Sequence, residues 1–124
     1  MKRLPLILKI LLGLVYVVFG LNYFLHFIPA PPMSGLPAQA MGVLAGSGWL
    51  TIVKVLEIAL GAMLLANFYA PLALVLLAPI TVNIAVFHAL IHPEGLPMGI
   101  VLLIIHVILL FLHKSYYQGM LRAK

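Results

Sequence analysis

Lys54 and Glu57 are the two residues of this chain whose types and spacing could best do chemistry. Both lie inside residues 49–68, an apolar stretch long enough to span a bilayer. Charge at membrane depth is costly, and Glu57 is one of only two acidic residues in the protein. Their i, i+3 spacing places both on one helix face, where they could exchange protons with a ligand. They therefore predict an intramembrane polar site. An ion pair that only fixes helix packing is the structural alternative.

Five further polar side chains accompany this pair on other apolar segments. Asn22 and His26 lie four residues apart on the first segment, so they share a helix face. Asn83 and His88 lie on the third segment, and His106 lies on the fourth as an additional candidate. All five fall in the middle or the outer half of their segments, which predicts a polar pocket open to the outside and walled by four helices. Interhelical hydrogen bonding is the alternative role for the two asparagines.

A quinone is the ligand that these residue types favour. Its carbonyl oxygens need hydrogen-bond donors, and its reduction needs a proton source, which histidine, glutamate, asparagine and lysine in an apolar cleft provide. Haem b stays an alternative, because His26 and His88 lie at similar depths on different segments. No short motif supports a metal site, so we predict none. The assignment of a catalytic residue stays open.

Composition places the chain among integral membrane proteins. It has 124 residues, of which 65% are hydrophobic and 7% are charged, against roughly 25% charged in soluble domains. The absence of cysteine excludes disulfides and thiol chemistry carried by this chain. The net charge of +5 comes from residues near both ends, apart from Lys54, so it does not form the basic surface of a nucleic-acid-binding protein. The predicted partner is the lipid bilayer.

The apolar runs predict an all-α fold with a single membrane domain over residues 1–124. The predicted spans are residues 6–27, 49–67, 72–91 and 98–112, with an outward loop at 29–48 and a short interfacial helix at 38–44. Short connections between spans favour an antiparallel four-helix bundle. Basic residues near both ends predict that both termini are cytoplasmic. The glycines predicted to allow close helix approach are Gly13, Gly20 and Gly61.

Several short runs together resemble the DoxX-like family of small bacterial membrane proteins. They are VFGLNYFLHFIP at 18–29, PPMSG at 31–35, KVLEI at 54–58 with Gly61, LAPITVNIAVFH at 77–88, and PEG at 93–95. The resemblance covers nearly the whole chain, although each run is weak by itself. It implies a four-helix bundle in the bacterial inner membrane. Its family-like polar positions are Asn22, His26, Lys54, Glu57, Asn83 and His88.

The same resemblance implies a membrane redox role. The family takes its name from a membrane subunit of thiosulfate:quinone oxidoreductase, so the leading expectation is a subunit of a quinone-linked redox system. Any sulfur chemistry would belong to a redox partner protein, because this chain has no cysteine. The alternative function is non-enzymatic: a small-solute transporter or an assembly partner of another membrane protein. A homodimer is compatible with the sequence, but no motif requires one.

Overall fold

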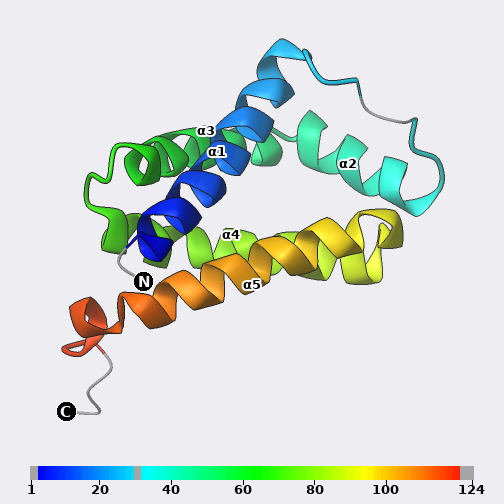
Figure 1. Cartoon of the computed structure of the whole chain (residues 1–124). Helices are drawn as coiled ribbons and strands as arrows, with labels where there is room; N and C mark the ends of the chain where they lie inside the picture. The colour runs from blue at the N-terminus through cyan, green and yellow to red at the C-terminus, as the bar shows by residue number, and fades with distance from the viewer. Residues whose placement is uncertain (1–2, 30–31, 121–124) are drawn as a thin grey trace.

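The computed structural model describes residues 3–29 and 32–120, and within these ranges it contains helices and no strands. Pro31, which follows the first predicted span, and Lys2, Arg122 and Lys124, which belong to the basic residues near the ends, lie outside the described residues. The elements are α1 (Leu4–Leu25), α2 (Leu36–Gly46), α3 (Trp49–Leu65), α4 (Ala70–Leu90), η1 (Pro93–Gly95), α5 (Leu96–Leu112) and η2 (Lys114–Tyr117) (Figure 1).

The helix boundaries follow local sequence features. Proline occupies the first turn of α1 and of α4, where its missing N–H leaves no hydrogen bond unmade. His26 ends α1 in a left-handed conformation, and Gly48 and Tyr69 adopt the same conformation just before α3 and α4 begin. α4 continues through Pro79. The predicted all-helical fold is confirmed for the described residues, and α2 includes the predicted short helix at 38–44.

Three of the helical segments are long and apolar enough to cross a membrane individually: α1, α4, and η1 with α5. α3 has 17 residues and passes the same test only together with α2, from which it is bent by 80°. At 1.5 Å per residue α3 is roughly 26 Å long, slightly less than the hydrocarbon core of a typical bilayer. The fold therefore holds three or four candidate spans, compatible with a multi-pass membrane protein in contact with lipid.

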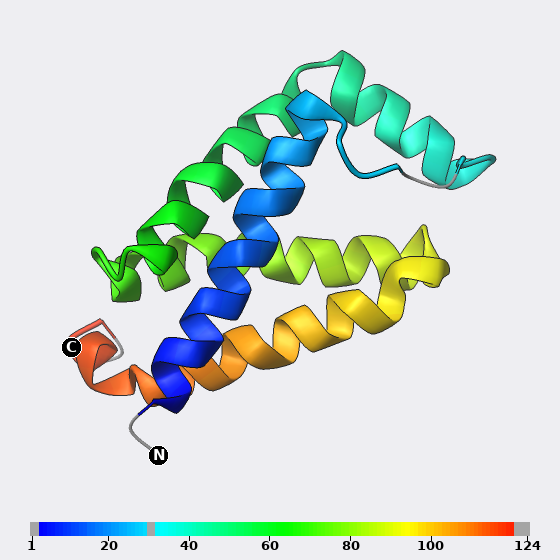
Figure 2. The ribbon, with the colours of Figure 1, turned by 45° about the horizontal axis from the view of Figure 1, so that its top comes forward.

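The helices form two closely packed pairs, α1 with α3 and α4 with α5. Figure 2 shows that the pairs converge where α1 begins and α5 ends, and separate toward α2 and η1. We call the first side the terminal end and the second the α2 end. The additional contacts of α3 with α4 and of α1 with α5 close a ring of four helices. This wedge shape leaves space between the pairs only toward the α2 end.

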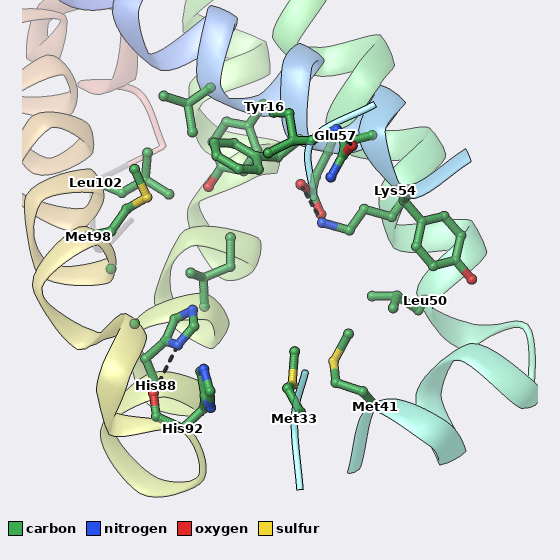
Figure 3. Close-up of a pocket in the computed structure, with 18 of the residues that line it drawn as sticks. Tyr16, Met33, Met41, Leu50, Lys54, Glu57, His88, His92, Met98 and Leu102 are labelled. Atoms are coloured by element: carbon green, nitrogen blue, oxygen red, sulfur yellow. Dashed lines mark hydrogen bonds and ion pairs between the residues drawn. The ribbon is translucent and has the colours of Figure 1, made fainter. Parts of the chain in front are cut away.

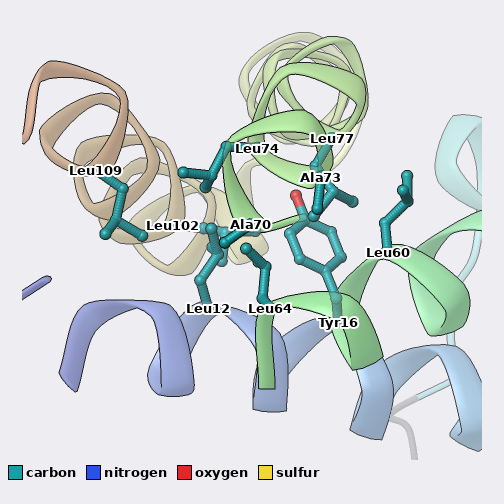
Figure 4. Packing of buried hydrophobic residues seen from close by; sticks show 10 residues of the cluster. All are labelled: Leu12, Tyr16, Leu60, Leu64, Ala70, Ala73, Leu74, Leu77, Leu102 and Leu109. Atoms are coloured by element: carbon teal, nitrogen blue, oxygen red, sulfur yellow. The ribbon is translucent and has the colours of Figure 1, made fainter. Parts of the chain in front are cut away.

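An apolar core fills the terminal end. Leu12, Leu64, Leu74 and Leu109, one from each of the four long helices, are completely buried there. They pack with the other members of the cluster shown in Figure 4, including Tyr16 and Leu77. Because these side chains come from all four helices, the core holds the two helix pairs together where they converge.

Glycines bring α1 and α3 into close contact. A Cβ atom added at Gly13 would lie 2.8 Å from the backbone oxygen of Gly61, and one added at Gly61 would lie 3.0 Å from the oxygen of Gly13. A Cβ atom at Gly20 would lie 2.6 Å from Cγ1 of Ile58. All three are closer than ordinary van der Waals contact. The predicted role of these three glycines in helix approach is therefore confirmed.

Polar contacts secure the terminal end outside this core. The Nζ atom of Lys9 is buried and donates to Oδ1 of Asn67 in the α3–α4 turn at 2.7 Å. The hydroxyl of Tyr117 in η2 donates to the carbonyl of Pro71 at 2.8 Å. Burial raises the pKa of this phenol, so Tyr117 keeps the proton that it donates. Within the described residues, every buried side-chain nitrogen or oxygen has a hydrogen-bond partner.

Candidate functional site

Two adjoining cavities occupy the space between the helix pairs toward the α2 end. The central cavity, about 660 Å³, is lined by residues of α1, α3, α4, α5 and the segment that leads into α2. The lateral cavity, about 640 Å³, is lined by α2, α3, α4 and the segments beside α2 and after α4. The residues that line both are Met33, Met41, Leu50, Lys54, Glu57, Ile84, His88 and His92. The two cavities therefore meet at the predicted Lys54–Glu57 pair.

The Lys54–Glu57 ion pair forms one wall of this meeting point. The Nζ atom of Lys54 lies 3.4 Å from Oε1 of Glu57. The lysine side chain is 20% exposed and the glutamate side chain only 4%, so the lysine is the partner more open to the cavity. Figure 3 shows the pair across the cavity from His88 and His92. Because the two charges neutralise each other, the site presents hydrogen-bonding groups without a net charge.

His88 is held on the opposite wall by its Nδ1 atom. This atom lies 3.1 Å from the carbonyl oxygen of His92. A carbonyl only accepts hydrogen bonds, so Nδ1 carries the proton, and Nε2 stays available to a ligand. A Cβ atom at Gly95 would lie 2.3 Å from the His88 ring, so the absence of a side chain at Gly95 makes room for the imidazole. η1 thus fixes the ring position of His88.

Asn22 and His26 line the central cavity where α1 ends. The side-chain oxygen of Asn22 accepts the backbone N–H of Ile28 at 2.7 Å, which stabilises the chain reversal after the helix. The backbone N–H of His26 donates to the Asn22 carbonyl at 2.8 Å, and its imidazole is exposed. Asn22 therefore shapes the cavity rim, while the His26 ring is free to contact a ligand.

Asn83 is the one predicted site residue that lines only the lateral cavity, where Pro79 and Phe87 accompany it on the same side of α4. It is exposed, and its side chain makes no hydrogen bond within the described part of the chain. The structure therefore gathers five predicted residues, Asn22, His26, Lys54, Glu57 and His88, around the central cavity and places Asn83 at the lateral one.

His106, the additional candidate, lines neither cavity and belongs to a buried hydrogen-bond chain beside them. Its Nε2 atom lies 2.8 Å from the Leu74 carbonyl, so it must be the donor. Its Nδ1 atom lies 2.7 Å from Oγ1 of Thr81, and that oxygen also bonds to the Tyr16 hydroxyl. The chain links α1, α4 and α5. Since Tyr16 lines the central cavity, the chain connects the cavity to the bundle interior.

His106→Leu is expected to lower the free energy of unfolding by about 1–2 kcal/mol, because the Leu74 carbonyl and the Thr81 hydroxyl each lose a buried hydrogen bond in a membrane bundle. Tyr16→Phe removes only the hydroxyl at the cavity end of the hydrogen-bond chain and leaves His106 bonded to Thr81 and Leu74. Its loss of stability should therefore be clearly smaller. Helical content followed by circular dichroism during titration with sodium dodecyl sulfate would measure both. Equal losses of stability in the two variants would contradict the proposed order of hydrogen bonds, in which Tyr16 is at the end and His106 has two partners.

Sequence reasoning did not select several residues of the site. Tyr16 precedes Phe19, Asn22 and His26 at helical spacing, which was a usable indication that it shares their face. Thr81 and His92 lie on one helix face with His88 by their spacing, but neither was predicted as a site residue. Met33 and Met41 cover the α2 end of the cavity, as Figure 3 shows. Nothing in their spacing indicated this, because their position depends on how α2 folds back over the helices.

A metal site built from several side chains gains no support from this geometry. No group of three or more histidine, cysteine, aspartate or glutamate side chains in residues 3–29 and 32–120 is arranged to hold a metal ion. His26 and His88, the two histidines considered for haem, line the same cavity from α1 and α4. The cavity offers hydrogen-bonding groups on an otherwise apolar wall, an arrangement suited to a small molecule with a polar head.

Comparison with known proteins gives this site no precedent. No family model, curated protein or solved structure matches the chain. The resemblance to the DoxX-like family therefore stays a prediction from the sequence.

Proposed function

We propose that the protein is a membrane subunit of a quinone-linked redox system and that the central cavity binds the quinone head. One observation carries the proposal: the Lys54–Glu57 pair and the Nε2 atom of His88 face one another across an apolar cavity of about 660 Å³. Such a cavity has a suitable size for a quinone ring. The self-neutralised ion pair favours an uncharged head over a phosphate or a carboxylate.

In this proposal the chain binds the quinone and delivers protons, while electrons come from a partner protein. Reduction of a quinone to a quinol takes two electrons from that redox partner and two protons. Lys54 donates a hydrogen bond to one carbonyl oxygen, and Glu57 exchanges protons beside it. The Nε2 atom of His88, the acceptor of the neutral ring, accepts a hydrogen bond from a hydroxyl of the quinol. The buried hydroxyl of Tyr16 also borders the ring site. The chain has no cysteine, so sulfur oxidation, if it is coupled, belongs to the partner.

The proposal includes an antiparallel four-helix bundle in a bacterial inner membrane, with both termini cytoplasmic. Arg3 and Lys114, the basic residues described near the ends, lie at the terminal end, and the start of α1 and η2 are on that side in Figure 2. Their charge supports a cytoplasmic position. The α2 end, with both cavities, then faces outward. Since buried leucines fill the terminal end, this arrangement supports a bound molecule better than a transport path.

Mass spectrometry of small molecules that co-purify in mild detergent tests the proposal. We expect a quinone with the wild-type protein and a strong loss of it with Glu57→Gln, which removes the proton-exchanging carboxyl. Glu94→Gln is the matched control, because Glu94 is the other acidic residue and lies exposed in η1 outside both cavities. Circular dichroism would establish that all three proteins are folded. Absence of quinone from the wild type and from Glu94→Gln would overturn the proposal.

A further inference from the structure

The lateral cavity has a different composition from the central one. Residues from neither α1 nor α5 line it, so it opens on the side of the bundle where α3 meets α4, beneath α2. Trp49, Val53, Ile80, Val86 and Phe87 make its walls largely apolar. Trp49 and Val86 are 64% and 45% exposed. In a bilayer this cavity is therefore open to lipid acyl chains.

Lys54, Glu57, His88 and His92 line this cavity as well as the central one, and Asn83 adds an amide that lines the lateral cavity alone. Asn83 lies exposed in the lateral cavity, and its amide makes no hydrogen bond within the described residues. An unpaired amide facing hydrocarbon is costly. A polar atom of a ligand that passes Asn83 would form a hydrogen bond with this amide.

We infer that the lateral cavity is the route by which a tailed amphiphile enters from the bilayer, with its tail left lying between α3 and α4. The ligand class is an uncharged, hydrogen-bonding ring with one long isoprenoid or alkyl chain. Three observations place the two parts. The cavities meet at Lys54 and Glu57, and further polar side chains line the central cavity alone. The residues that line only the lateral cavity are apolar apart from Asn83. This inference rests on the proposed quinone function and adds the tail site and the entry side.

The inference is tested by making the tail pocket smaller without touching the head site. Val53 lines only the lateral cavity, so Val53→Phe narrows it. Val55→Phe is the matched control: it makes the same change on the same helix, at an exposed residue that lines neither cavity. Trp49 is the single tryptophan of the chain and lies in the lateral cavity, so saturable quenching of its fluorescence in lipid nanodiscs reports quinone binding.

The probes are two matched pairs of quinones, each with the same kind of head and with or without a tail. They are menadione with its geranylgeranyl-tailed menaquinone, and 2,3-dimethoxy-5,6-dimethyl-1,4-benzoquinone with decylubiquinone, in which a decyl chain replaces one ring methyl. The chain has no cysteine for menadione to alkylate. We expect Val53→Phe to weaken binding of the tailed members about tenfold, while the tail-less members bind as in wild type. Val55→Phe should bind all four quinones as the wild type does.

The outcomes separate the inference from the function on which it rests. If Val53→Phe binds tailed and tail-less quinones with unchanged affinity, or loses both equally, the tail route is wrong while quinone binding by the wild type stands. If the wild-type protein shows no saturable quenching with any of the four quinones, both the route and the proposed function fail. Circular dichroism of Val53→Phe and Val55→Phe would show that both variants keep the helical content of the wild type.

Discussion

Lys54→Met is expected to destabilise the protein by about 3 kcal/mol, the cost of an uncompensated charge at membrane depth on insertion scales. Lys54 is the partner of Glu57 at 3.4 Å, and the Glu57 side chain is only 4% exposed. Without the ammonium, the carboxylate has no neighbouring positive charge. Acidification protonates the Glu57 carboxylate and so removes its negative charge. The loss of stability in Lys54→Met should therefore shrink as the pH falls. Titration with sodium dodecyl sulfate, followed by circular dichroism at several pH values, would measure it.

A second substitution separates the ion pair from the loss of a lysine side chain. Lys54→Met combined with Glu57→Gln leaves no buried charge at this site, so most of the lost stability should return. Lys114→Met is the matched control, because Lys114 is exposed just after α5, where its Nζ atom lies 4.6 Å from the centroid of the Phe111 ring. If the single and the double variant unfold at the same detergent fraction, the pair makes no contribution to stability, and its value lies in binding alone.

Gly13→Val is expected to have an effect of similar size through a different cause. A Cβ atom at this position meets the Gly61 backbone oxygen at 2.8 Å, and a backbone oxygen cannot rotate away as a side chain can. α1 and α3 must therefore separate, at a cost on the order of 3 kcal/mol, near the upper limit for overpacked cores. The same detergent titration would measure the loss.

The matched control for this prediction lies in α2. Gly42→Val makes the same change in a helix, but an added Cβ atom at Gly42 has no neighbour within 4 Å. Its stability should stay within about 0.5 kcal/mol of the wild type, as is usual for surface positions. Equal effects of Gly13→Val and Gly42→Val would show that the close contact of α1 and α3 does not matter for stability.

Much of the architecture could be predicted from the sequence, because it depends on local patterns. Long apolar runs separated by prolines and glycines located the helices to within a few residues, since hydrocarbon admits little other backbone structure. The scarcity of charge singled out Lys54 and Glu57, and both line the two cavities. Small residues in apolar helices likewise indicated that Gly13 and Gly61 would lie at helix–helix contacts. This prediction does not depend on which helix is the partner.

Only the tertiary structure determined how these faces meet. The bond from Tyr16 to Thr81 joins residues 65 positions apart, and the one from Thr81 to His106 joins residues 25 positions apart. Periodicity fixes which residues share a face, but it does not fix the rotation of one helix against another. For the same reason the sequence did not distinguish Asn83, at the lateral cavity, from the residues around the central one. The 80° bend between α2 and α3 also depends on packing, and it places Met41 over the site.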